Sequence, residues 1–417
     1  MGGPTWPPYP QRSDRPPATF LNMLKPIRRV VTGNDERGRS RVLFDSAAPN
    51  VNPRAVSPGA GMTDVWVFPT CPAAMSGERD DGNLPFNFEP PEHGGHLRIV
   101  QSTGRPPGYD PAKDPAAVPV HAPTQRPGGT WDRGGQNAFS SPIHKSATVD
   151  YGIVLEGERV LRLDDREYVM RPGDVVVQLG NWHGWTNPRI GSLMAFVMMG
   201  ATMSEGAIEA PSETSPRIDG AGKAGARKDR RATAIGDAVR PVRRIVTIDD
   251  ESGRSIAIQD GPSPDVRTDP ARPGFASTRI WVTDRTPAKI QGVRETLHVP
   301  HTIEPPPGGS VCRIVTLPPD HTYRGKVGAR EVQAFFRAMG SAGASTYSPK
   351  APHPYMQKTR TLDFCLVLEG EITLVLDTEE VHLKTGDTVI QRGTNHAWSN
   401  RSTRPCVVAI SSHDATE

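Results

Sequence analysis

A long internal repeat constrains the fold of this chain more than any other feature. Residues 150–187, DYGIVLEGERVLRLDDREYVMRPGDVVVQLGNWHGWTN, recur as residues 363–400, DFCLVLEGEITLVLDTEEVHLKTGDTVIQRGTNHAWSN. The two segments align without a gap, and roughly half of their positions are identical, which is far above chance for a window of this length. The match extends upstream, where residues 26–32 (PIRRVVT) correspond to residues 241–247 (PVRRIVT). We therefore predict that the chain is one ancestral unit written twice.

Each copy has the pattern of antiparallel strands joined by tight turns. Runs rich in Val and Leu are separated in the first copy by the turn signals at 156–158 (EGE) and 171–174 (RPGD). Branched residues bounded by Gly, Pro and Asp are typical of strands. One segment, 329–339, has apolar residues at i, i+3, i+4 and i+7 and is predicted to be a helix packed on a barrel.

The phrases VLEGE, PGDVVVQ and GNWHGWTN resemble the core of the cupin superfamily, whose fold is a small β-barrel with a metal in its mouth. Two copies imply a bicupin. The expected fold is all-β, with two tandem antiparallel, jelly-roll-like barrels and a few short helices. The predicted segments are a Pro-rich arm (1–25), an N-terminal unit (26–200, barrel core 140–200), a linker (201–240) and a C-terminal unit (241–417, barrel core 350–412).

Composition limits the classes of partner. The chain has 417 residues, enough for two complete cores, and a net charge of +3 that favours no polyanion such as nucleic acid. No run of about 18 apolar residues is present, so no membrane span is expected. The four cysteines have no C-x-x-C spacing, which predicts free thiols and a cytoplasmic protein. The expected partner is a small-molecule substrate, and a homodimer is compatible with the sequence.

The resemblance implies a metal site in the first unit. Cupins supply an H-x-H pair, a carboxylate four residues later and a His in the second motif. Counted back from VLEGE, these positions are His144, Ser146, Asp150 and His183, so His144, Asp150 and His183 are the predicted ligands. On a single strand, His144, Ser146 and Asp150 would share one face because side chains alternate with period 2.

Two imidazoles and one carboxylate are the ligand type of non-haem Fe(II) oxygenases, and Zn or Mn would also fit. The alternative is that these polar side chains only hydrogen-bond one another, as in cupins that have lost their metal. The second unit has Gln357, Thr359, Asp363 and His396 at the matching positions. With one imidazole and a weak amide ligand, this unit is expected to bind no metal.

Five further residues of the first unit are candidates for substrate binding, because aromatic walls with a few polar groups are usual in small-molecule pockets. They are Ser146, Tyr151, Gln178, Trp182 and Trp185. For Trp185 a packing role is equally compatible, because Trp398 stands at the same place in the second unit. His96 has no metal-ligand spacing to another histidine and is interpreted as an ordinary strand residue.

The function that we expect is a metal-dependent enzyme acting on a small organic molecule. Oxygenation at Fe(II) in the N-terminal barrel is the leading reaction. The alternatives are a non-redox reaction at a Lewis-acid metal, such as decarboxylation or isomerisation, and a bicupin that binds a small molecule without catalysis. Fold resemblance alone does not distinguish them, because one barrel supports many chemistries.

Overall fold

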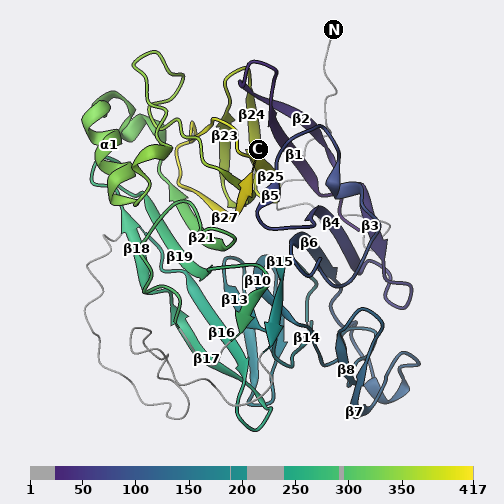
Figure 1. The fold of residues 1–417 in the computed structure, drawn as a ribbon. Coiled ribbons are helices and arrows are strands. Elements are labelled where there is room, and N and C mark those ends of the chain that lie inside the picture. The colour runs from purple at the N-terminus through teal and green to yellow at the C-terminus, as the bar shows by residue number, and fades with distance from the viewer. Residues whose placement is uncertain (1–23, 188, 204–238, 291–294, 417) are drawn as a thin grey trace.

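Strands dominate the structure, a computed structural model that describes residues 24–187, 189–203, 239–290 and 295–416. The body consists of two nine-stranded sheets, accompanied by three smaller sheets of three strands each (Figure 1). The all-β prediction is confirmed. Most of the predicted arm (1–25) and of the predicted linker (201–240) lies outside the described residues.

The first large sheet belongs mainly to the N-terminal half. Its strands are β3 (Asn50–Pro53), β4 (Gly61–Phe68), β6 (Gly95–Ser102), β10 (Thr148–Gly157), β13 (Val175–Leu179), β15 (Ser192–Met203), β16 (Arg243–Asp249), β17 (Ser255–Pro262) and β20 (Ala288–Ile290). They are ordered β17-β16-β13-β10-β15-β6-β4-β3, with β20 paired to β15. The small sheets of this half contain β11 (Arg159–Arg162), β12 (Glu167–Met170) and β14 (Gly184–Thr186), and β7 (Val120–Gln125), β8 (Trp131–Gly134) and β9 (His144–Lys145).

The second large sheet repeats this arrangement in the C-terminal half. Its strands are β1 (Arg28–Asn34), β2 (Ser40–Ala47), β5 (Ala73–Ala74), β18 (Asp265–Thr268), β19 (Ala276–Thr283), β21 (Ser310–Leu317), β22 (Thr361–Glu369), β25 (Thr388–Arg392) and β27 (Cys406–Thr416). The order is β18-β19-β21-β27-β22-β25-β1-β2, with β5 paired to β27. The accompanying small sheet contains β23 (Glu371–Val375), β24 (Glu380–Lys384) and β26 (Ala397–Ser399).

The two halves exchange their first hairpins. Strand β1 pairs in parallel with β25, with Val30 opposite Val389, and β16 pairs in parallel with β13, with Ile245 opposite Val176. Figure 1 shows β1 and β2 beside the C-terminal strands, and β16 and β17 beside β13 and β10. Each repeat therefore completes the sheet of the other, and the sheets cross the boundary at 201–240 that divides the repeats in the sequence.

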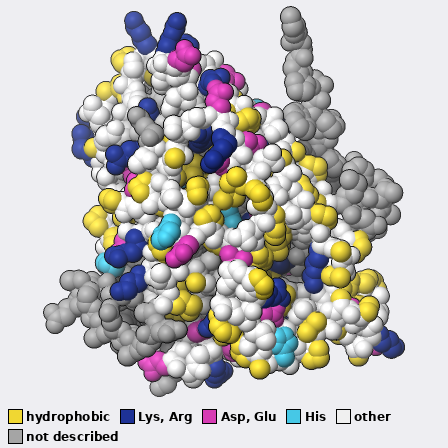
Figure 2. Space-filling view, turned by 45° about the vertical axis from the view of Figure 1, so that its right-hand side comes forward, with side chains coloured by type: hydrophobic (Ala, Val, Ile, Leu, Met, Phe, Trp, Pro, Cys, Tyr) yellow, Lys and Arg dark blue, Asp and Glu magenta, His cyan; other side chains and the backbone are white. Residues whose placement is uncertain are grey.

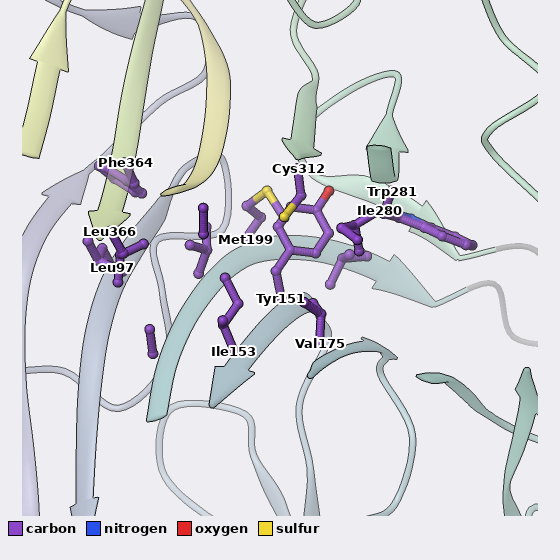
Figure 3. Close-up of a cluster of buried hydrophobic side chains, with 14 of the residues drawn as sticks. Leu97, Tyr151, Ile153, Val175, Met199, Ile280, Trp281, Cys312, Phe364 and Leu366 are labelled. Atoms are coloured by element: carbon purple, nitrogen blue, oxygen red, sulfur yellow. The ribbon is translucent and has the colours of Figure 1, made fainter. Parts of the chain in front are cut away.

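A shared hydrophobic core lies between the two large sheets. One face of each sheet supplies it, and Figure 3 shows how side chains from both halves meet there. The labelled members are Leu97, Tyr151, Ile153, Val175, Met199, Ile280, Trp281, Cys312, Phe364 and Leu366. The opposite faces line separate interiors, one in each half. Because each buried apolar side chain contributes about 1.5–3 kcal/mol, this common core ties the halves into one unit.

Short helices connect the strands. The predicted helix at 329–339 is confirmed as α1 (Ala329–Ala338), which buries Val332, Phe335 and Phe336. Its Phe335 packs edge-on against Phe275, with ring centroids 5.2 Å apart. The 3₁₀ turns are η2 (Asp81–Asn83), η3 (Pro111–Lys113), η4 (Asp320–Thr322), η5 (Arg324–Lys326) and η6 (Ala342–Ala344).

Several composition-based expectations can be compared with the structure. The four cysteines are free thiols, as predicted, and three of them are buried. In the described ranges no helix has the length and apolarity needed to cross a bilayer. On the face shown in Figure 2, basic and acidic side chains are interspersed and do not gather into a patch of one sign.

Substitution His413→Gln should make the free energy of unfolding depend less steeply on pH in the acidic range. His413 is fully buried between Phe68 and Phe364, with ring centroids at 4.7 and 5.0 Å, and burial lowers its pKa to about 3. The unfolded chain binds this proton near pH 6.5, so stability is lost as pH falls from about 6.5 to 3, by about 1.4 kcal/mol per pH unit for one proton. Urea unfolding at a series of pH values should show this slope reduced in the variant. Equal slopes in both proteins would contradict the assignment.

Candidate functional site

Two histidine side chains of the N-terminal half lie side by side. His144 belongs to β9, and His183 directly precedes β14. Their backbones exchange two hydrogen bonds, of 2.8 and 2.9 Å, and their ring centroids are 4.3 Å apart. The structure thus brings together two residues that are far apart in the sequence and that the family pattern implied as ligands.

Both rings are held in the same tautomer. His144 donates from Nδ1 to the Pro142 carbonyl at 2.9 Å, and His183 donates from Nδ1 to the Asn181 carbonyl at 2.9 Å. A carbonyl oxygen only accepts, so each Nδ1 carries the proton and each Nε2 carries a lone pair. No hydrogen bond between described residues uses either Nε2. This orientation, with one nitrogen anchored on the backbone, is the usual one for metal-binding imidazoles.

Burial keeps both imidazoles neutral. It lowers the pKa of His144 to about 4. It also lowers the pKa of His183 well below its usual value, and the neighbouring His144 ring lowers that pKa further. The two Nε2 lone pairs are therefore available at neutral pH for a metal ion or for a hydrogen-bond donor of a ligand.

Asp150 is not brought into the same cluster. The expected single strand is interrupted at Ser146 and Ala147, between β9 and β10, so His144 and Asp150 do not have the regular spacing of residues on one strand. In the described part of the chain, no group of three His, Cys, Asp or Glu side chains could hold a metal ion. The predicted set of three ligands is thus assembled only in part, as a pair of imidazoles.

Asp150 instead belongs to a polar row across the interior face of the N-terminal sheet. In the strand register Gln178 lies opposite Asp150, Asp150 opposite Met198, and Met198 opposite His96. The side chains of this row face the interior that contains Met198 and Trp185. Sequence reasoning missed His96, because its membership depends on the pairing of β6 with β15 and not on local spacing.

The row contains polar atoms without partners. Asp150 Oδ1, His96 Nε2 and both amide atoms of Gln178 are buried and have no hydrogen bond to a described residue. Burial raises the pKa of Asp150 to about 7, against the opposing hydrogen bond from Thr148. Unsatisfied buried polar groups are rare and costly, so hydrogen-bonding groups of a bound molecule would stabilise these atoms.

The remaining predicted residues have different surroundings. Trp185 lies in the interior, with its ring 6.0 Å from His183 and 5.5 Å from Phe196, centroid to centroid. Ser146 is buried and its hydroxyl lies 2.9 Å from the Thr130 hydroxyl, which donates in turn to the Glu89 carboxylate.

Two predicted residues face away from this interior. Tyr151 is directed to the core between the halves, where its hydroxyl lies 2.9 Å from that of Ser310 (Figure 3). Trp182 stacks instead with the cationic groups of Arg133 and Lys145, at 4.7 and 5.1 Å from its ring centroid. In both cases the residue is next to an inward-facing one, Asp150 or His183, and alternation turns it to the opposite side.

In the C-terminal half the equivalent residues are Gln357 and His396, and a hydrogen bond joins their side chains. His396 donates from Nδ1 to the Thr394 carbonyl at 2.9 Å, as its counterpart does. Its Nε2 accepts a hydrogen bond from the Gln357 amide, with the nitrogens 3.2 Å apart. The lone pair that is unused in His183 is therefore occupied in His396.

Comparison with known proteins finds similarity to a family model, to fungal proteins and to a solved structure. Residues 345–412 match the family model described as a cupin domain. The chain is 30% identical over 176 residues to phomopsin biosynthesis cluster protein C' of Diaporthe leptostromiformis, over 34% of this chain and 77% of that protein. It is 52% identical over 48 residues to the cupin-domain-containing oxidoreductase virC of Hypocrea virens, over 11% of this chain and 25% of that protein. A solved variant of salicylate 1,2-dioxygenase from Pseudoaminobacter salicylatoxidans aligns with 12% identity and a TM-score of 0.32, covering 76% of this chain and 68% of that one.

The chain belongs to the cupin family, and the resemblance inferred from its repeated motifs is confirmed. The matched model covers the second repeat, whereas the imidazole pair with unused Nε2 atoms lies in the first.

Proposed function

We propose that this protein is a cupin oxidoreductase that acts on a small organic molecule in the interior of its N-terminal half. The observation that carries the proposal is the pair of neutral imidazoles, His144 and His183, whose Nδ1 atoms are anchored and whose Nε2 atoms are unused. The oxidoreductase name of the relative virC supports the reaction class. In the C-terminal half, where Gln357 closes the corresponding pair, we propose no such centre.

The donor set suits a divalent first-row metal, because neutral imidazole is a common ligand for iron, zinc and manganese alike. Fe(II) is the ion that we favour, since it would supply the electron-transfer chemistry that an oxygenation requires. His144 and His183 would hold it. Asp150, which the family pattern implies as a third ligand, is instead proposed as a polar group of the interior that binds substrate together with Gln178 and His96.

The other side chains give the interior its selectivity. Trp185 and Phe196 form an apolar wall beside the imidazole pair, whereas the unsatisfied atoms of Asp150 and Gln178 require hydrogen-bonding groups from the ligand. A substrate with both an apolar body and polar substituents would match this lining. Buried polar groups discriminate strongly, because a ligand without the matching donor or acceptor leaves them unpaired.

Elemental analysis of protein purified without added metal tests the proposal. Stoichiometric iron is the expected result and would support the oxidoreductase. Zinc or manganese would favour a non-redox enzyme such as a lyase or isomerase. Protein that contains no metal, and that takes up none in anaerobic titration with Fe(II), would overturn the proposal in favour of a metal-free binding protein.

Substitution Asp150→Asn distinguishes a role of Asp150 as a metal ligand from a role in binding substrate. If two imidazoles hold the metal, the variant should keep its metal content, because Asn conserves shape and removes only the charge. If Asp150 is a ligand, the affinity should fall by about 10-fold or more, since a neutral amide is a poor ligand. Competition with a chelator of known affinity measures the difference, and a loss of that size would restore the three-ligand set.

A further inference from the structure

Leu179 of the N-terminal half and Arg392 of the C-terminal half occupy equivalent positions. They stand at the same place in the two sequence repeats, and each is the last residue of its strand, β13 or β25. The strand register agrees, since Leu179 lies opposite Val149 and Arg392 lies opposite Leu362. One half therefore has a short apolar side chain where the other half has a guanidinium group.

Arg392 is held by backbone carbonyls and by an indole ring. Its Nη2 donates to the three successive carbonyls of residues 75–77. Its guanidinium carbon lies 5.9 Å from the ring centroid of Trp66, and that of Arg29 lies 6.0 Å from the same centroid. Trp66 thus has two guanidinium neighbours, one from each of two strands.

Trp281 is the counterpart of Trp66 in the other half. Each of the two tryptophans follows an irregularity in the pairing of its strand, β4 or β19. The guanidinium carbon of Arg244 lies 5.9 Å from the Trp281 ring centroid. Within the described ranges no second cation stacks on this ring, and Leu179 stands where the second one, Arg392, would be.

A cavity of about 250 Å³ lies at this place. Leu179 and Trp281 both line it, together with β20, the counterpart of β5. Leu179 faces the shared core, so a sheet separates the cavity from Asp150 and Gln178 on its other face. The apolar side chains of the wall are Val149, Leu179, Trp281, Val282, Ala288, Ile290 and Val299.

Charged side chains complete the wall. Asp284 and Arg285 are both more than half exposed and pair with each other at 3.1 Å, and Lys289 is an exposed base. Glu295 is less exposed, and in the described part of the chain its Oε2 accepts one hydrogen bond, from Arg244 at 2.6 Å. A carboxylate has about four lone-pair sites, so Glu295 can accept a further donor from a ligand.

We propose that this cavity binds a small organic molecule with a guanidinium or amidinium group, which stacks on Trp281 as Arg392 stacks on Trp66. Such a group is planar and weakly hydrated, and an indole is the best aromatic partner for a cation. Leu179 and Val149 would contact the apolar part of the molecule, and Glu295 would accept from its N–H groups. The site goes beyond the function proposed for the N-terminal interior and involves neither of its imidazoles.

Calorimetric titration of the full-length protein with phenylguanidine tests the site, with phenylurea as the neutral probe of the same shape. We expect phenylguanidine to bind the wild type, and phenylurea to bind roughly tenfold more weakly or not at all, because it lacks the charge. Substitution Leu179→Arg introduces the residue of the other repeat, which should fill the cavity and abolish binding. Leu179→Val is the matched control, because it leaves the cavity open and apolar, and it should bind phenylguanidine like the wild type.

Three results would overturn the proposal. They are no binding of phenylguanidine to the wild type, equal affinity for phenylurea, and undiminished binding to Leu179→Arg. If Leu179→Arg does not fold, wild-type crystals soaked in 4-bromophenylguanidine decide instead. They should show an anomalous bromine peak in the cavity, with the guanidinium group over the Trp281 ring. Bromine density only elsewhere, or a guanidinium group directed away from Trp281, would contradict the assignment.

Discussion

Substitution His183→Ala is expected to remove bound metal and activity while leaving the fold intact. The variant would retain one imidazole, His144, and so resemble the C-terminal half, where Gln357 stands beside His396. Loss of one of two imidazole ligands should weaken metal binding by at least about 100-fold, beyond the 10–100-fold typical of losing an outer-shell partner. Metal content after gel filtration, and chelator competition for the affinity, measure the effect.

This variant should still fold without metal. The costs are the hydrogen bond from His183 to the Asn181 carbonyl, about 1 kcal/mol, and the lost packing of the buried ring against His144 and Trp185. Many buried apolar side chains at about 1.5–3 kcal/mol each carry the fold, and a chain of this size needs no metal to fold.

The matched control for this experiment is His396→Ala, at the equivalent position of the other half. It should leave metal content and activity unchanged. If His396→Ala proved to be the inactivating change and His183→Ala had no effect, the site would lie in the C-terminal half and our assignment would be wrong. If neither variant lost metal or activity, the imidazole pair would have no catalytic role.

A fragment whose ends are chosen to keep one sheet complete should fold better than a fragment whose ends coincide with one sequence repeat. Residues 24–239 contain the first repeat with its own hairpin β1–β2, which belongs to the sheet of the other half. Residues 48–263 form a fragment of equal length that instead contains β16–β17, the hairpin that pairs with β13. In the first fragment β13 has an open edge and β1–β2 has no sheet to join.

Thermal unfolding of the two purified fragments would measure the difference. Both expose the same face of the shared core, so that cost cancels in the comparison. We expect a cooperative transition from 48–263 and little or none from 24–239, because unpaired strand edges and an unburied hairpin favour aggregation over folding. Cooperative unfolding of 24–239 with none for 48–263 would show that the exchanged hairpins do not hold the sheets together.

Much of the candidate site could be read from local patterns. The repeated motifs indicated the family, the strand and turn signals located β10, β13 and their turns, and the family spacing selected His144 and His183, which the structure places side by side. The substitution of Gln357 in the second repeat predicted that the halves differ, and the structure adds that this amide occupies the His396 lone pair. These features depend on residue identity and short-range spacing, which a sequence states directly.

Other features depend on which strands become neighbours. The alternation argument assumed one strand from His144 to Asp150, but the strand is interrupted at Ser146 and Ala147. The pairing of β10 with β13 and β15 places Asp150 in a row with Gln178 and His96 that crosses the sheet. Tyr151 faces the shared core because the other half covers that side of the sheet.

The family, the all-β class, the repeat and the pair of histidines could all be predicted from the amino-acid order, because each follows from motifs or from periodicity within a few residues. The exchange of hairpins, the polar row with His96 and the placement of Arg279 opposite Arg313 in the strand register are visible only in the folded structure. These depend on the register between strands far apart in the chain. That register is set by burial of whole sheet faces, since a shift of one residue would turn every apolar side chain of a strand to the wrong side.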